Sequence, residues 1–239
     1  MNTATGHSPE YAPLTPSGAS RHARQLFADA SAVQRAMQYF RPRIAPMGLL
    51  AQLVPAEASV LDVGCGCGLF LGLLARTGRI SRGVGIDADA RAIDCANLMR
   101  RRLPHPERIE FVHAQADAPV RQGTFDVVSL IDLLHHVPPD RRRAVICQAA
   151  GLVGPGGRLV VKDMAARPLW RATANRLHDL VLARQWIHHV DFDAVKEWLH
   201  ELGFLQAGHV SVSMWWYAHE LVWFEPRQYR LKDPAHRAA

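Results

Sequence analysis

Three glycines at alternate positions follow a short apolar run in the segment Val60-Leu61-Asp62-Val63-Gly64-Cys65-Gly66-Cys67-Gly68-Leu69-Phe70. The apolar run has the length and composition of a buried strand, and the apolar residues after Gly68 have the spacing of a helix. Glycines in such a strand, turn and helix let the backbone approach a ligand where a Cβ atom would clash. The spacing is GxGxG rather than the GxGxxG of dinucleotide-binding folds, which argues against a nicotinamide coenzyme.

Two acidic residues follow at the ends of the next predicted strands. Asp87 ends one strand, where a carboxylate can accept hydrogen bonds from both hydroxyls of a ribose. Asp117 lies in the segment Ala116-Asp117-Ala118 after the next strand, where it could accept a hydrogen bond from an adenine amino group. Either carboxylate alone could simply cap a turn. Their common register with the glycine loop predicts a ligand that contains a nucleoside.

Strands and helices alternate through the middle of the chain. Apolar patterns predict strands over 59–63, 82–86, 109–113, 125–131 and 157–161, and helices over 69–76, 90–101 and 139–150. This alternation is typical of βαβ units in an α/β fold with a parallel sheet. Towards the C-terminus the sequence predicts helices over 167–185 and 192–202, and then an antiparallel hairpin of strands 207–213 and 220–224.

The glycine loop and the two acidic residues together resemble the class I S-adenosylmethionine-dependent methyltransferases, in their small-molecule branch. The resemblance covers about Leu49 to Pro226 and includes the Gly154-Pro155-Gly156-Gly157 turn before the fifth strand. It implies a Rossmann-like, seven-stranded, mostly parallel sheet of order 3-2-1-4-5-7-6, with an antiparallel C-terminal hairpin and helices on both faces. Cys67 departs from the family pattern, which has a small Ser, Thr or Ala there, but it is small enough to leave cofactor binding intact.

The same resemblance implies S-adenosyl-L-methionine as the cofactor, with Asp87 holding the ribose and Asp117 the adenine. Because a sulfonium cation carries no phosphate, the loop needs close backbone approach and a nearby carboxylate such as Asp62. The residues assigned to the cofactor are Asp62, Gly64, Cys65, Gly66, Gly68, Asp87, Ala88, Asp117, Ala118 and Ile131.

The remaining segments divide the chain around this domain. Residues 1–20 are rich in small and polar residues and predict a flexible tail, followed by a helical lid over 21–55. We expect the methyltransferase domain over 56–226, with a substrate-covering helical insert over 164–190, and a C-terminal tail over 227–239. Apolar residues from Leu26 to Phe40 recur with a helical period, which predicts one amphipathic helix whose apolar stripe packs in the core.

Two histidines follow the fourth strand, at the sheet edge where sites of α/β proteins lie. His135 and His136 are the candidate catalytic residues, because an imidazole suits a general base that deprotonates a hydroxyl acceptor at neutral pH. Either ring could instead hold the following turn. Candidate contacts for the acceptor, taken from the lid and the insert, are Tyr39, Phe40, Trp170 and His189; Arg41 and Arg43 lie on the same lid segment.

The resemblance to the small-molecule branch, together with the aromatic residues in the lid and the insert, implies methyl transfer to a hydroxyl or carbon of a hydrophobic or aromatic small molecule. Asp132 is followed by Leu133-Leu134 rather than by the Pro-Pro-aromatic motif of enzymes that methylate nucleobase amines, which disfavours a nucleic-acid substrate of that type. The sequence after Asp163 lacks the pattern of magnesium-dependent members, so we expect no metal. A catalytically inactive, cofactor-binding regulatory subunit stays open as an alternative. A second alternative, an RNA or protein methyltransferase, also stays open. It is indicated by a pI of about 9.5 and by the triplets Arg100 to Arg102 and Arg141 to Arg143.

Composition places the chain among globular proteins. It has 239 residues, 49% hydrophobic and 21% charged, which supports a sizeable core. No apolar run reaches the roughly 18 residues of a membrane span, and the N-terminus has no basic and apolar leader, so we expect a cytoplasmic protein with reduced cysteines. The run Trp215-Trp216-Tyr217 is interpreted as edge packing of the hairpin; a role in dimerisation or membrane-surface contact stays open, as does the choice between monomer and homodimer.

Overall fold

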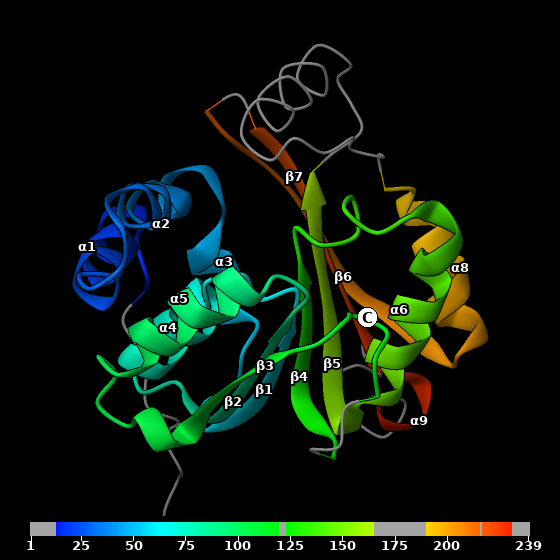
Figure 1. Ribbon diagram of the computed structural model, residues 1–239. Helices are drawn as coiled ribbons and strands as arrows, with labels where there is room; N and C mark the ends of the chain where they lie inside the picture. Colours follow the sequence, from blue (N-terminus) through cyan, green and yellow to red (C-terminus); the bar gives the residue numbers. More distant parts are fainter. Residues whose placement is uncertain (1–12, 120–122, 165–189, 216, 231–239) are drawn as a thin grey trace, which may run out of the picture.

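The computed structural model describes residues 13–119, 123–164, 190–215 and 217–230. Seven strands form one sheet in the order β3-β2-β1-β4-β5-β7-β6 (Figure 1). The strands are β1 (Ala58–Val63), β2 (Ile80–Asp87), β3 (Ile109–His113), β4 (Phe125–Ile131), β5 (Val153–Met164), β6 (Phe204–Met214) and β7 (Tyr217–Pro226). The first five are parallel, and β7 runs antiparallel to both β5 and β6. The Rossmann-like fold and the strand order that the family resemblance implies are confirmed.

Helices cover both faces of this sheet (Figure 1). On one face lie α1 (Pro16–Leu26), α2 (Ala32–Ile44), α3 (Met47–Gln52), α4 (Leu69–Arg76) and α5 (Ala90–Arg100). On the other lie α6 (Pro139–Gly151) and α8 (Phe192–Glu201), and the short elements η1 (Pro106–Arg108) and α9 (Arg227–Arg230) flank the sheet. Each face buries its own apolar cluster, which gives the three-layer core of an α/β domain.

The N-terminal segment differs from its prediction. Two helices replace the single one expected, because two local start signals outweigh the continuous apolar period. Thr15 caps α1 and accepts a hydrogen bond from Gly18 N at 3.1 Å, so α1 begins within the segment predicted to be a flexible tail. Ser31 begins α2 with a capping box to Gln34. Of the stripe expected in the core, Leu26 and Ala30 are buried, whereas Val33, Met37 and Phe40 are exposed.

The C-terminal third agrees with its prediction where the structure describes it. Helix α8 and the hairpin are present, and both strands of the hairpin are longer than predicted. Trp215 is exposed at the hairpin turn, whereas Tyr217 is buried and stacks on His219, so the aromatic run does not share one environment. The helix predicted over 167–185 and most of the insert, with Trp170 and His189, lie outside the described residues. Across the described ranges, no helix is both long and apolar enough to span a bilayer.

Candidate functional site

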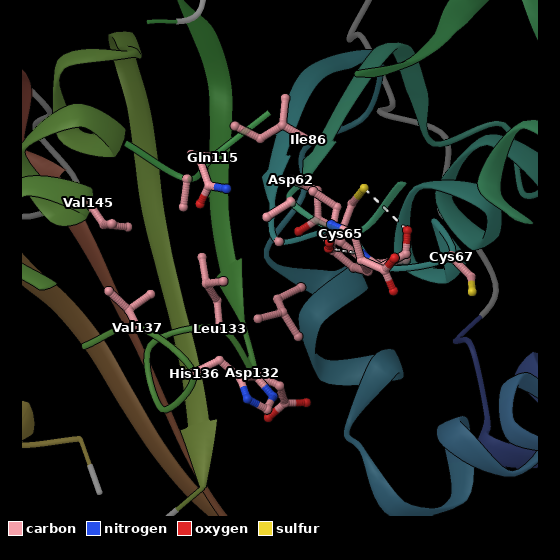
Figure 2. A pocket seen from close by; sticks show the side chains of 18 of the residues that line it. Asp62, Cys65, Cys67, Ile86, Gln115, Asp132, Leu133, His136, Val137 and Val145 are labelled. Atoms are coloured by element: carbon pink, nitrogen blue, oxygen red, sulfur yellow. Dashed lines mark hydrogen bonds between the residues drawn. The ribbon is translucent and has the colours of Figure 1, made fainter. Parts of the chain in front are cut away.

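A cavity of about 680 Å³ opens where the parallel strands end, beside the glycine loop (Figure 2). The carboxyl ends of parallel strands are where α/β folds bind ligands. Its walls come from the loop after β1, the end of β2, the segment after β3, the end of β4, the start of α6 and helix α2. The cavity therefore brings together most of the segments that the sequence assigned to a cofactor.

The glycine loop is held in place by the end of β2. Gly64 N and Cys65 N both donate to Ile86 O, at 2.8 and 3.0 Å, and Gly66 N donates to Asp87 Oδ2 at 2.7 Å. Gly64, Cys65 and Gly66 line the cavity, as predicted for residues near a cofactor. Burial raises the pKa of the Cys65 thiol. The pKa of the Cys67 thiol is raised by a hydrogen bond between Cys67 and Cys95. Both thiols therefore stay protonated.

Gly68 has a different role from the one assigned to it. It does not line the cavity, and a Cβ atom there would meet the Phe111 ring at 2.5 Å. At Gly66 a Cβ atom would meet nothing within 4 Å, because this side of the loop faces open space. Both glycines have positive φ, 54° at Gly66 and 77° at Gly68. Gly66 is therefore open for a ligand, and Gly68 is required for packing.

This difference predicts distinct outcomes for two alanine variants. Gly66→Ala carries only the cost of a left-handed alanine, about 1–2 kcal/mol of unfolding free energy. Gly68→Ala carries the same cost plus overpacking against Phe111, about 1–3 kcal/mol more. Thermal unfolding of the two variants checks the order. Equal melting temperatures would contradict the packing role of Gly68.

Asp62 is a buried carboxyl group at the floor of the loop. It is 2% exposed, lines the cavity, and accepts a hydrogen bond from Ser129 Oγ at 2.7 Å. Burial raises the pKa of Asp62 to about 7; the Ser129 hydrogen bond opposes this shift and the negative charge of Asp87 adds to it. The carboxyl group is thus poised to ionise when a cation enters beside it.

The acidic residues after β2 and β3 lie on the cavity wall as predicted. Asp87 is fixed by accepting from Gly66 N and from Asp89 N, the latter at 2.9 Å, and Ala88 lies next to it on the wall. Asp117 also lines the cavity, where the ion pair with Arg141 lowers the pKa of Asp117.

Of the remaining two residues assigned to the cofactor, Ile131 and Ala118, one lines the cavity and the other does not. Ile131 lies on the cavity wall. Ala118 does not, and its carbonyl oxygen accepts from Gln148 Nε2 at 3.2 Å. The assignment of Ala118 to the cofactor is therefore not supported by its position.

The two candidate catalytic histidines have different surroundings. His136 lines the cavity, and Figure 2 shows it at the same end as Asp132. His135 is buried outside the lining; its Nδ1 lies 2.6 Å from Asp163 Oδ1, and its ring centroid lies 4.0 Å from that of His136. Of these two histidines, His136 is the one that lines the cavity. In the described part of the chain, no group of three His, Cys, Asp or Glu side chains is placed to hold a metal ion.

Helix α2 contributes to the cavity through residues other than those predicted for the acceptor. Neither Tyr39 nor Phe40 lines it: the Arg43 guanidinium lies 4.4 Å from the Tyr39 ring centroid, and Phe40 is exposed. The helix instead turns Gln38 and Arg41 to the cavity, three residues apart on one face. The sequence analysis placed Arg41 on the lid but could not give its direction.

A buried ionic cluster beside the cavity was not predicted at all. Asp132 accepts from Arg41 Nη2 at 2.8 Å and from Lys162 Nζ at 2.5 Å, and Lys162 is completely buried. Burial by itself raises the pKa of Asp132, but the neighbouring Lys162 and Arg41 outweigh it and lower that pKa well below its usual range. Asp132 is therefore a permanent anion rather than a proton acceptor. The one signal in the sequence was a lysine within the apolar strand around Val161.

Comparison with known proteins places this site in a family. The chain matches the family model of a methyltransferase domain over residues 24–205, which is most of its length. The chain belongs to this family of methyltransferase domains. The match includes the glycine loop, the acidic residues and the histidine pair that form or flank the cavity.

Two curated relatives of the methyltransferase domain act on small molecules according to their names. A ubiquinone biosynthesis O-methyltransferase of Xanthomonas axonopodis pv. citri is 35% identical over 120 residues, covering 49% of this chain and 48% of the relative. A 27-O-demethylrifamycin SV methyltransferase of Amycolatopsis mediterranei is 34% identical over 122 residues, covering 50% and 44%. The chain spans about half the length of the curated relatives it matches.

Solved structures share the fold at low identity. The magnesium protoporphyrin IX methyltransferase of Synechocystis PCC 6803, with bound S-adenosylmethionine, superposes with a TM-score of 0.61 at 17% identity, covering 95% of this chain and 100% of that one. An O-methyltransferase family 2 protein of Planctomyces limnophilus, in complex with apigenin, gives 0.62 at 18% identity, covering 80% and 59%. These likenesses support the fold of the methyltransferase domain.

Proposed function

We propose that this chain transfers a methyl group from S-adenosyl-L-methionine to a hydroxyl or carbon of a hydrophobic or aromatic small molecule. The observation that carries the proposal is a single cavity with two chemically different ends. One end has the glycine loop and the carboxyl groups of Asp62 and Asp87, and the other has the imidazole of His136. The names of the curated relatives, which are O-methyltransferases of small molecules, support an oxygen acceptor.

The carboxyl groups and the glycine loop fit this cofactor. The two hydrogen bonds from backbone amides hold Asp87 at the cavity wall, and each of its oxygens keeps a lone pair for a ribose hydroxyl. The open side of Gly66 leaves room for a ligand against the backbone. Asp62, with a pKa near 7, can take the charged form beside a sulfonium or ammonium group. We propose the other loop residues on the wall and Asp117 as further contacts.

In the reaction, the chain chiefly aligns the two partners. When bound, S-adenosylmethionine supplies a methyl group on a positively charged sulfur, which keeps the electron pair of the S–C bond as the acceptor oxygen or carbon forms its new bond. His136 accepts the proton that the acceptor loses, and passes it to solvent. Asp163 holds the buried His135, whose ring packs on His136 and supports its orientation. His135 is thus a positioning residue.

Contacts of the arginine triplets weaken the alternative of an RNA substrate. Arg102 pairs with Asp29 at 2.5 Å, and Arg100 donates to Ile109 O at 3.1 Å. In the second triplet, Arg141 and Arg143 pair with Asp117 and Glu201, and Arg142 is buried and donates to Val137 O at 3.1 Å. Five of the six guanidinium groups thus have partners within the fold, whereas Arg101 is exposed.

Calorimetric titration with S-adenosylmethionine and with its demethylated product tests the cofactor. We expect the wild type to bind both, and Asp87→Ala to bind about 100-fold more weakly, because each hydrogen bond to a charged group contributes about 1.5–3 kcal/mol. Glu110→Ala, an exposed carboxylate on β3, is the matched control and is expected to bind as the wild type does. A wild type that binds neither ligand would overturn the proposal.

Turnover with phenolic acceptors then tests the reaction. A wild type that binds the cofactor without methylating any of these acceptors would favour the alternative of a catalytically inactive regulatory subunit.

A further inference from the structure

The buried ionic cluster lies between the lid and the sheet, next to the acceptor end of the cavity. Its members come from separate elements: Arg41 from α2, Asp132 from the residue after β4, Lys162 from β5 and His219 from β7. Asp132 is the centre, with Lys162 Nζ at 2.5 Å and Arg41 Nη2 at 2.8 Å. His219 Nε2 donates to Ile44 O at 2.6 Å and so ties the end of α2 to β7.

The charges in this cluster do not cancel. Lys162 is fully buried against Asp132 and compensates its charge, which leaves the charge of Arg41 in excess. Burial lowers the pKa of His219 to about 4, with Lys162 adding to the effect, so His219 is neutral. Asp163 also lies near Lys162, but alternation along β5 turns it to the opposite face, where it pairs with His135. Lys162 and Asp132 compensate each other inside the protein, and the guanidinium of Arg41 adds a positive charge on the cavity wall, close enough to Asp62 to oppose the rise of the Asp62 pKa.

Arg41 is the member that delivers this charge to a ligand. Its side chain lines the cavity and is 42% exposed, unlike the fully buried Lys162. A guanidinium has five N–H donors in a planar fork, and among the described residues Asp132 engages it through Nη2 only. Asp132 thus holds the guanidinium in one orientation and leaves donors for a second planar anion, the geometry that suits a carboxylate.

We propose that Arg41 is a specificity-determining residue, and that it binds a carboxylate group carried by the acceptor. The substrate class is then a hydrophobic or aromatic acid whose carboxylate lies against Arg41 while its hydroxyl or carbon nucleophile faces His136. Gln38, three residues before Arg41 on the cavity wall, supplies a neutral hydrogen-bonding group beside the same subsite. This inference rests on the proposed function, since it assigns the acceptor of that reaction.

Matched pairs of acids and esters test the inference. The probes are 3,4-dihydroxybenzoate and 3,4-dihydroxycinnamate with their methyl esters, titrated by calorimetry into protein saturated with S-adenosylhomocysteine. We expect the wild type to bind at least one acid about 10-fold or more tightly than its ester, because a charge-assisted hydrogen bond is lost in the ester. Arg41→Gln is expected to bind acid and ester equally, and Arg41→Lys to restore part of the preference.

Controls separate recognition from a purely structural role of Arg41. Arg43→Gln, on the same helix but stacked on Tyr39 outside the cavity, is expected to keep the acid preference. Arg41→Gln is expected to bind S-adenosylhomocysteine as the wild type does; loss of that binding would place Arg41 on the carboxylate of the cofactor and would overturn the inference. A wild type without any preference for the acids, or an Arg41→Gln that keeps the preference, would overturn the inference. Failure of the wild type to bind S-adenosylhomocysteine would instead overturn the proposed function.

Discussion

Asp132→Asn is expected to lower the free energy of unfolding by about 3–5 kcal/mol, the usual cost of removing one partner from a buried ion pair. The substitution leaves Lys162 fully buried without its carboxylate, whereas the partly exposed Arg41 can turn to solvent. Asparagine is the suitable replacement because Asp132 has a φ of 53°, a left-handed conformation that asparagine tolerates. Any loss of stability then reports the missing charge rather than backbone strain.

Dependence on pH and a double variant identify the cause of that loss. Burial already lowers the pKa of Lys162, and removal of the Asp132 carboxylate lowers it further. At pH values between this lowered pKa and the ordinary lysine pKa, the unfolded chain binds more protons than the folded protein, so the stability of the variant rises with pH. The defect of Asp132→Asn should therefore shrink between pH 7 and pH 10 in urea unfolding. The double variant Asp132→Asn with Lys162→Met removes both charges and should recover much of the loss. Strictly additive effects of the two substitutions would contradict a coupled pair.

Asp62→Asn is expected to stabilise the protein at pH 8 while weakening cofactor binding. The pKa of Asp62 is raised by burial to about 7 in the folded state from an ordinary value of 3.8. Between these values the folded state binds more protons than the unfolded chain, so the contribution of Asp62 is present below pH 4 and is lost as pH rises through 7. At pH 8 that loss is at most about 4 kcal/mol, and asparagine, which resembles the protonated form, avoids it.

Thermal unfolding at pH 4 and at pH 8 measures this effect. The melting temperatures of Asp62→Asn and wild type should agree at pH 4 and separate at pH 8, with the variant higher. Asp94→Asn, on the exposed face of α5, is the matched control and should change stability little at either pH. A variant less stable than wild type at pH 8 would show that Asp62 is held as a carboxylate in the free protein. Calorimetry with S-adenosylmethionine gives the opposing loss of affinity.

Much of the fold was predictable because its signals are local in the chain. The alternating apolar strands and helices predicted a parallel α/β sheet, with bounds for β3, β4 and α4 that agree with the structure, and the order of the strands came from the family resemblance. The N-terminal helices were predicted less well. Their apolar period runs through the break between α1 and α2, and only the caps at Thr15 and Ser31 mark where the two helices begin.

The site divides in the same way. Gly66 and Asp87 were predicted to line the site because each lies at the carboxyl end of a strand that the sequence pattern predicts. The contact between Arg41 and Asp132 joins positions 91 residues apart, and that between His219 and Ile44 spans 175 residues. Such contacts depend on how α2 docks against three strand ends. No pattern within one segment of the sequence encodes that docking.

Strand β5 places opposite charges on adjacent residues and sends them to opposite faces of the sheet. Lys162 supports Asp132 on one face, and Asp163 supports His135 on the other. The pairing of Lys162 with Leu221 and Asp163 with Glu220 on β7 fixes this register. A deletion of one residue before Lys162 in β5 would place Asp163 under Asp132 and Met164 beside His135, whereas an insertion would place Val161 under Asp132 and Lys162 beside His135. Chimaeras between homologous enzymes should therefore exchange β5 together with its β4 and β7 neighbours, and recombination junctions within this strand should be strongly selected against.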